Sequence, residues 1–261
     1  MFPDLFSIGP LTLHTYGLLV ATGFVVGLLV TVWIGKRYDI NQQQVMDMGF
    51  IIILSAIIGS RLGYVIINAS YYWKHPIDIF KLWDGGLVFS GGTIFVILIM
   101  SFYIKRHHLS FWQIGDLWTP AAAIGQGIGR IGCFMAGCCY GKPTDVCWGV
   151  IFTNSKSLAP LNEALHPTQL YSSLSGLIIF IVLMVLHAKR RFEGQVFLWF
   201  LILHSTSRLL IERFRGDDRG FIASIDMSMT QLGAILILVA AVVALFIRTS
   251  SGKGKDSGQM S

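Results

Sequence analysis

The sequence predicts an all-α fold, that of a polytopic integral membrane protein with seven transmembrane helices. Hydrophobic residues make up 54% of its 261 positions and charged residues only 13%, whereas an average soluble domain holds roughly 25% charged residues. This composition leaves too little polar surface for a globule in water. We expect a single membrane domain over residues 1–248 and a short tail over residues 249–261.

Seven apolar segments are long enough to cross a bilayer, which takes about 20 residues of helix. They cover residues 14–35, 46–68, 87–104, 117–138, 169–188, 194–212 and 228–247. The first follows no basic region and continues without a small-residue cleavage site, so we expect an anchor and not a cleaved signal. No internal repeat is visible, which disfavours an alternating-access transporter.

Basic residues between the segments predict the orientation of the chain. The first, third and fifth loops and the tail carry ten Lys and Arg residues, whereas the longer second, fourth and sixth loops carry seven. We therefore expect the amino terminus outside and the carboxyl terminus in the cytoplasm. The tail has no apolar content to bury and should be a disordered cytoplasmic segment.

Three arginines lie inside the predicted spans: Arg61, Arg130 and Arg208. A guanidinium in a bilayer is costly and normally faces a cavity or a partner, so each marks a candidate site. Arg61 lies between Gly59 and Gly63, small residues that let another helix approach closely. For Arg61 a structural role and substrate binding both remain open.

Arg130 occupies a glycine-rich apolar stretch, and the obvious anion at that depth is a lipid phosphate. Gln126 and Cys133 lie four residues before it and three after, so they share one helical face with the guanidinium. The glycines of the stretch serve tight helix packing equally well. The arginine makes this face a candidate headgroup site.

Arg208 repeats this pattern nearer the carboxyl end. His204, Arg208 and Glu212 follow one another at steps of four residues, which places them on one helical face. Arg208 and Glu212 either simply pair, or Glu212 orients Arg208 for an anion.

Two loop segments contain polar groups and glycines. Residues 82–93 hold two glycine pairs, Gly85-Gly86 and Gly91-Gly92, which permit close backbone approach to an anion or a lipid ester. Residues 166–171, His-Pro-Thr-Gln-Leu-Tyr, open the fifth span with polar groups. Both adjoin outer loops in the predicted orientation, so we expect the site in the extracytoplasmic half.

Four cysteines fall within fifteen residues: Cys133, Cys138, Cys139 and Cys147. They form no paired C-x-x-C framework, and thiols at small-residue positions of membrane helices usually pack. Packing is therefore the preferred interpretation. A disulfide near the outer face and a metal site, with His166 as a further ligand, are the alternatives.

In combination these motifs resemble the prolipoprotein diacylglyceryl transferases of bacterial inner membranes, over nearly the whole chain. The matching motifs are His14-Thr-Tyr16-Gly17, Gly59-x-Arg61-Leu-Gly-Tyr64, Asp84-Gly-Gly-Leu-x-Phe-x-Gly-Gly92, Gly129-Arg-Ile-Gly132 with Gly141, His166-Pro-x-Gln-Leu-Tyr171 and Arg208-x-x-x-Glu212-x-x-Arg215. The resemblance implies transfer of the diacylglyceryl group of phosphatidylglycerol to the lipobox cysteine in the signal peptide of a preprolipoprotein. Glycerol 1-phosphate is then released.

The resemblance also implies a location and partners. The protein would be a multi-pass protein of the bacterial inner membrane, with its active site toward the periplasmic half and membrane lipids around it. It implies no metal or other cofactor and no nucleic acid.

The same resemblance implies roles for individual residues. Arg130 and Arg208 would hold the phosphate and stabilise the leaving group, which gains charge as it departs. Tyr16 would donate a hydrogen bond near the headgroup, and Glu212 would orient Arg208. The implied substrate-binding set also includes Gln126, Gly141, Gly91, Ser90 and Arg61, and Gly141 matches a position that tolerates no side chain.

Three positions depart from the family pattern. Ser90 stands where family members commonly have a histidine, and Cys133 and Cys138 stand where they have Asn and Glu. An unperturbed serine is no base near neutral pH, so we expect the thiol proton to leave to His166, Glu212 or water. The alternatives are a related transferase with another thiol or lipid substrate, and a non-catalytic lipid-binding or lipid-transporting membrane protein.

Overall fold

The computed structural model describes residues 2–8, 11–38, 40–81, 85–217, 221–222 and 227–256. They form two compact units, one of Met1–Thr31 with Gly115–Ser261 and the other of Val32–Ile114. The prediction of one domain over residues 1–248 stays a prediction.

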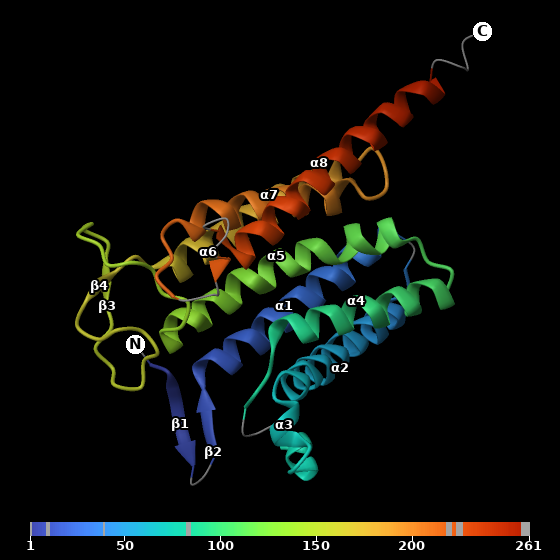
Figure 1. The fold of residues 1–261 in the computed structure, drawn as a ribbon. Coiled ribbons are helices and arrows are strands. Elements are labelled where there is room, and N and C mark those ends of the chain that lie inside the picture. Colours follow the sequence, from blue (N-terminus) through green and yellow to red (C-terminus); the bar gives the residue numbers. More distant parts are fainter. Residues whose placement is uncertain are drawn as a thin grey trace. The chain divides into compact units, whose positions relative to one another are not determined.

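A long helix occupies each of the seven predicted apolar segments (Figure 1). These helices are α1 (Thr15–Gly35), α2 (Gln42–Ile67), α4 (Phe89–Arg106), α5 (Phe111–Ala136), α6 (Thr168–Ala188), α7 (Gln195–Glu212) and α8 (Met229–Asp256). Within the described residues, five are long and apolar enough to cross a membrane: α1, α2, α4, α6 and α8. The chain is therefore a polytopic membrane protein. The tail predicted to be disordered covers residues 249–261. Residues 249–256 belong to α8 and residues 257–261 lie outside the described residues, so the disorder of the tail stays a prediction.

Short elements complete the described fold. A four-residue helix α3 (Ala69–Tyr72) and a 3-10 helix η1 (Pro76–Phe80) follow α2. The strands form three two-stranded antiparallel sheets: β1 (Asp4–Ile8) with β2 (Leu11–His14), β3 (Val150–Ile151) with β4 (Ala164–Leu165), and β5 (Phe221–Ile222) with β6 (Met227–Ser228).

In the first unit, glycines bring α5 into close contact with both α1 and α6. A Cβ atom on Gly23 of α1 would lie 2.8 Å from the carbonyl oxygen of Gly125, and one on Gly176 of α6 would lie 3.0 Å from the Cα atom of Gly127. The glycines around Arg130 thus serve helix packing, as the sequence left open. A buried apolar cluster of α5, α6 and α7 lies next to the Gly127–Gly176 contact; its buried members are Ala123, Ile179, Leu183 and Val196.

The amino terminus of α7 is fixed by a buried carboxylate of α5. Asp116 is fully buried and accepts hydrogen bonds of 2.8 Å from the backbone N–H groups of Gly194 and Phe197. Arg190 lies 3.6 Å from the same carboxylate. Because free N–H groups at a helix start favour an anion, Asp116 holds α7 in register with α5.

Residues 137–167 pack around a small core of their own. Phe152, Ala159 and Leu165 are buried and form a cluster beside β3 and β4. Lys156 in this segment lies 2.7 Å from Asp4, which ties the segment to the β1–β2 hairpin.

In the second unit, α2 and α4 cross at glycines, and Arg61 holds the segment between them. A Cβ atom on Gly91 would lie 3.0 Å from the Cα atom of Gly63. The buried Arg61 guanidinium donates hydrogen bonds to the carbonyl oxygens of Asp78 (2.6 Å), Ile79 (2.9 Å) and Gly85 (2.6 Å). These contacts give Arg61 a structural role, one of the two that the sequence left open.

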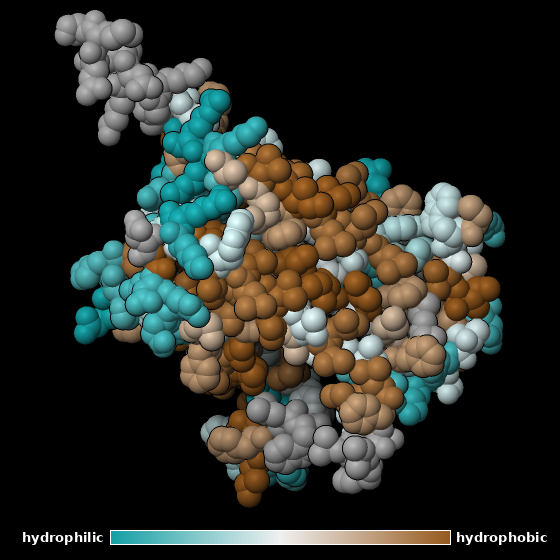
Figure 2. All heavy atoms as spheres, turned by 180° about the vertical axis from the view of Figure 1, so that it is seen from behind, coloured by the Kyte–Doolittle hydropathy of each residue, from teal (hydrophilic) through white to brown (hydrophobic). Residues whose placement is uncertain are grey.

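Large apolar side chains are exposed along the helices that qualify as membrane spans. Examples are Leu29 of α1, Phe50 of α2, Phe102 of α4, Ile181 of α6 and Phe246 of α8. On the face drawn in Figure 2, hydrophobic atoms cover much of the surface. Such a surface is stable when lipid tails cover it, in agreement with the composition.

Candidate functional site

A narrow crevice between α5, α6 and α7 contains Arg130 and Arg208, the two arginines that the family resemblance assigns to the phosphate. Gln126 and Arg130 of α5 and His204 and Arg208 of α7 line it, with Ser175 and other small residues of α6. Its volume is about 10 Å³, close to the smallest space that holds a water molecule. Arg130 makes no hydrogen bond or ion pair with any described residue, so its guanidinium is available to an anion.

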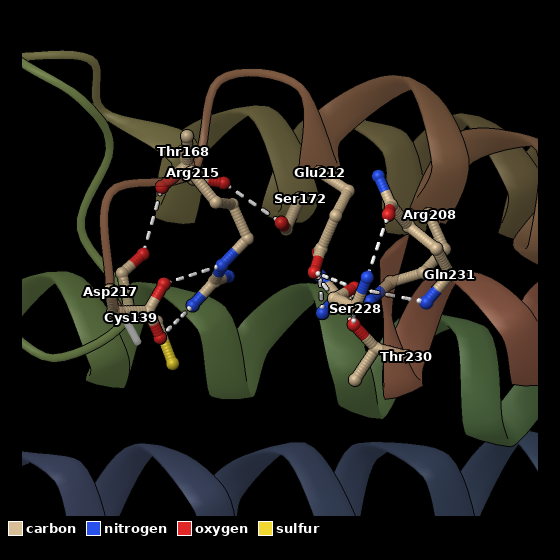
Figure 3. Close-up of polar contacts among 10 residues, drawn as sticks. All are labelled: Cys139, Thr168, Ser172, Arg208, Glu212, Arg215, Asp217, Ser228, Thr230 and Gln231. Atoms are coloured by element: carbon tan, nitrogen blue, oxygen red, sulfur yellow. Dashed lines mark hydrogen bonds and ion pairs between the residues drawn. The ribbon is translucent and has the colours of Figure 1, made fainter. Parts of the chain in front are cut away.

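Arg208 is held by a carboxylate whose other oxygen is also occupied (Figure 3). The Arg208 guanidinium lies 2.8 Å from Glu212, one turn further along α7, and the two side chains are only 15% and 7% exposed. The second carboxylate oxygen accepts hydrogen bonds from the hydroxyl groups of Ser228 (2.9 Å) and Thr230 (2.6 Å). The pairing predicted from the spacing is confirmed, and the network fixes the position of Glu212.

The start of α8 supports this network. The Ser228 hydroxyl accepts from the backbone N–H of Gln231 at 3.1 Å, and the Gln231 side chain accepts from the backbone N–H of Ser228 at 3.0 Å. This reciprocal pair is a capping box, which fixes the first turn of a helix. The two hydroxyl groups that hold Glu212 therefore stand on a rigid helix start.

A second buried arginine follows α7. Arg215 is 5% exposed and donates two hydrogen bonds of 2.8 Å to the carboxylate of Asp217 (Figure 3). Its positive charge also acts on the thiol of Cys139. The neighbouring Cys133 and Cys138 thiols, together with the Arg215 guanidinium, hold the pKa of the Cys139 thiol below its usual range, because they stabilise the thiolate.

Backbone pairing brings Arg215 to the cysteines. The N–H of Lys142 donates to the carbonyl of Phe214 at 2.8 Å, and the N–H of Gly141 donates to the carbonyl of His166 at 3.0 Å. A Cβ atom on Gly141 would lie 2.8 Å from the Phe214 carbonyl oxygen. Only glycine fits between these two segments, which is a physical reason for the intolerance implied by the family resemblance.

Three thiols meet at the end of α5. The sulfur atoms of Cys133, Cys138 and Cys139 all lie within 4.8 Å of one another. All three cysteines are free thiols, as is the exposed Cys147. The disulfide, one of the alternatives to packing, is not formed in this structure, and the cluster is tighter than the sequence spacing indicated.

A large cavity lies beside the Arg208–Glu212 pair. Its volume is about 950 Å³, near the upper end for ligand sites. Polar and apolar residues line it together: Lys142, Pro143, Leu209, Leu210, Glu212, Arg213, Arg215, Gly216, Asp217, Met227, Ser228, Gln231 and Ile235. This mixture suits an amphiphile with an anionic group.

The other residues predicted for the site lie in different parts of the structure. Tyr16, in the first turn of α1, packs on Gly132 of α5, where a Cβ atom would lie 3.3 Å from its ring. The His166 ring lies 3.2 Å from the hydroxyl of Tyr171, outside the crevice. Ser90, Gly91 and Arg61 belong to the second unit.

Part of one predicted loop lies outside the described residues, namely Leu82, Trp83 and Asp84. Sequence reasoning did not single out Arg215 with Asp217 as site residues. The signal for them was the Arg-x-Asp spacing directly after a predicted span.

The fold and the buried arginines define a polytopic membrane protein with cationic groups on helices α5 and α7. The model of the prolipoprotein diacylglyceryl transferase family matches residues 3–247, and the chain belongs to this family.

Curated relatives agree with this assignment, and each is named a phosphatidylglycerol–prolipoprotein diacylglyceryl transferase. The chain is 33% identical to the protein of Clostridium tetani over 247 residues, which cover 95% of this chain and 96% of the relative. It is 36% identical to that of Geobacter sulfurreducens, over 88% of each chain. It is 35% identical to that of Bordetella avium, over 95% of this chain and 94% of the relative.

Proposed function

We propose that this protein transfers the diacylglyceryl group of phosphatidylglycerol to the lipobox cysteine thiol of a prolipoprotein. The thioether product remains on the protein substrate, and glycerol 1-phosphate leaves. The observation that carries the proposal is the pair of arginines, Arg130 and Arg208, in one crevice beside a cavity with amphiphilic lining. Family membership and the names of the relatives support the reaction.

The two arginines stabilise the phosphate in different ways. Arg130 has no partner among the described residues, so its charge is free for the phosphate of the lipid. Arg208 is kept in place by Glu212, whose carboxylate is in turn held by Ser228 and Thr230. As the carbon–oxygen bond breaks, negative charge grows on the departing phosphate, and fixed cations in a site of low dielectric lower that barrier.

The remaining predicted residues act around this centre. Gln126 shares the crevice and donates a hydrogen bond to the headgroup, while Tyr16 does so from the first turn of α1. Gly141 keeps the segments of His166 and Phe214 in contact. His166, Glu212 or water accepts the thiol proton. Ser90, Gly91 and Arg61 belong to the proposed substrate-binding set as well.

We further propose that all seven long helices span the bacterial inner membrane, with the amino terminus outside and the carboxyl terminus in the cytoplasm. The site then lies toward the periplasmic half. Its residues support this placement, because Glu212 ends α7, Cys133 is in the last turn of α5, and His166 lies two residues before α6. These ends adjoin loops that the distribution of basic residues places outside.

The test is a reconstituted transfer reaction. Purified protein is mixed with phosphatidylglycerol and a lipobox peptide, and the peptide mass and the released glycerol 1-phosphate are measured together. We expect both products in equal amounts, and neither with a peptide whose cysteine is replaced by serine. No product under conditions in which the Clostridium tetani relative is active contradicts the proposal, and retention or movement of intact lipid points to a binding or transport protein.

A further inference from the structure

The cluster of Cys133, Cys138 and Cys139 has no task in the reaction described so far. Its three sulfur atoms lie within 4.8 Å of one another. Zinc binds thiolate sulfur at about 2.3 Å in tetrahedral geometry, which places bound sulfur atoms roughly 3.8 Å apart. Even at the 4.8 Å limit, an inward shift of roughly 0.6 Å at each sulfur would suffice for three Zn–S bonds.

The backbone holds these thiols together without a metal. Gly137 (φ 77°) and Cys139 (φ 62°) both have left-handed backbone, which turns the chain back toward Cys133 after α5 ends. The buried side chains of Thr168 and Gln169 then donate to the carbonyl groups of Cys139 (2.8 Å) and Cys138 (2.9 Å). A left-handed cysteine costs free energy, so the turn is maintained by contacts from α6.

We propose that Cys133, Cys138 and Cys139 bind one zinc ion and leave its fourth position open to the thiol of the prolipoprotein. Three protein ligands with an open position are the arrangement of catalytic zinc sites, whereas structural sites have four. Soft thiolate ligands favour zinc over magnesium or calcium. This departs from the expectation, implied by the family resemblance, that no metal takes part.

Neighbouring residues fit the charge of such a site. Three thiolates and one zinc ion carry a net charge of −1, and the positive charge of the Arg215 guanidinium acts on the Cys139 thiol. Groups around a metal ligand adjust the charge at the metal. Arg130 lies one helical turn before Cys133, so the open position is near the crevice that Arg130 and Arg208 line.

The bound metal activates the substrate thiol, which Ser90 cannot do because an unperturbed serine is no base near neutral pH. A thiol that coordinates zinc loses its proton, here to water. The thiolate sulfur forms a bond to the glyceryl carbon that carries the phosphate, the carbon–oxygen bond breaks, and its electron pair stays on the phosphate of glycerol 1-phosphate. The thioether product is uncharged and a weaker ligand, which favours its release. This role for the metal rests on the proposed function, but zinc binding itself does not.

Metal binding is tested first, without any activity assay. Full-length protein in detergent, kept reduced, is titrated with Co²⁺ in place of zinc, and absorption is recorded. We expect one equivalent to give thiolate-to-cobalt charge-transfer bands and the visible bands of tetrahedral cobalt, both displaced by Zn²⁺. Cys133→Ser, Cys138→Ser and Cys139→Ser should each weaken binding at least tenfold, whereas Cys147→Ser, outside the cluster, should bind as the wild type. Absence of these bands in the wild-type protein, or equal loss in Cys147→Ser, overturns the proposal.

Activity is tested second, and it separates the two proposals. A strong chelator should lower diacylglyceryl transfer at least tenfold, and added Zn²⁺ should restore it. Full transfer in metal-free protein overturns the zinc site and leaves the proposed function intact. Cobalt binding at the three cysteines without any transfer keeps the metal site and contradicts the proposed function.

Discussion

Glu212→Gln isolates the charge of the buried ion pair on α7. The substitution keeps the shape and one oxygen that accepts from Ser228 and Thr230, and it removes the negative charge 2.8 Å from Arg208. At that distance the attraction is worth about 6 kcal/mol at an effective dielectric constant of 20. Desolvation offsets part of it, and breaking a buried pair by removing one charge typically costs about 3 to 5 kcal/mol.

The expected result is a lower melting temperature together with a lower turnover. A loss of about 3 kcal/mol lowers the Tm of a chain of this size by about 6 to 12 °C. Because Arg208 loses its anchor, turnover should fall at least about tenfold, or about 1.4 kcal/mol of transition-state stabilisation. Thermal unfolding in detergent, followed by tryptophan fluorescence, and the transfer assay measure the two effects.

The matched control is Lys156→Gln. It breaks an ion pair of nearly the same length, 2.7 Å to Asp4, but the Lys156 side chain is 69% exposed, and exposed pairs contribute little. A Tm of Glu212→Gln equal to that of Lys156→Gln, with wild-type turnover, refutes the argument that the buried pair positions Arg208.

Three further results are expected. Arg130→Ala should cut turnover at least about tenfold with little change in Tm, because Arg130 makes no hydrogen bond or ion pair within the described structure; wild-type turnover contradicts its role. Gly141→Ala should lower Tm and activity, since its Cβ atom would lie 2.8 Å from a backbone carbonyl oxygen, whereas Gly17→Ala, with nothing within 4 Å, should not. A hydrogen bond from Lys156 lowers the pKa of Asp4, so Asp4 stabilises the hairpin above its unfolded pKa and loses this effect as pH falls through the folded pKa. Tm measured from neutral to acid pH should therefore fall further in the wild type than in Asp4→Asn, and parallel curves contradict this.

Local spacing predicted the parts of the site that lie on a single helix. The four-residue steps from Gln126 to Arg130 and from Arg208 to Glu212 place each pair on one face, and both pairs lie together in the structure. The seven apolar segments predicted the long helices for the same reason, because helix periodicity and length are local properties.

Contacts between distant segments were beyond such reasoning. Arg215 reaches Cys139 through backbone pairing of residues 141 and 215, which no spacing reveals. The thiol cluster depends on two left-handed residues after α5 and on Gln169 of α6. The irregular cysteine spacing favoured packing over a ligand set, because sequence distance does not report a turn of this kind.

Complementation tests the central claim most directly. The chain is expressed in a bacterial strain depleted of its own diacylglyceryl transferase, and growth and the mass of a reporter lipoprotein are measured. We expect growth and a diacylglyceryl-modified cysteine with the wild-type chain, and neither with Arg130→Ala. An unmodified lipoprotein and no growth, although the wild-type chain is present in the membrane, would contradict the assignment.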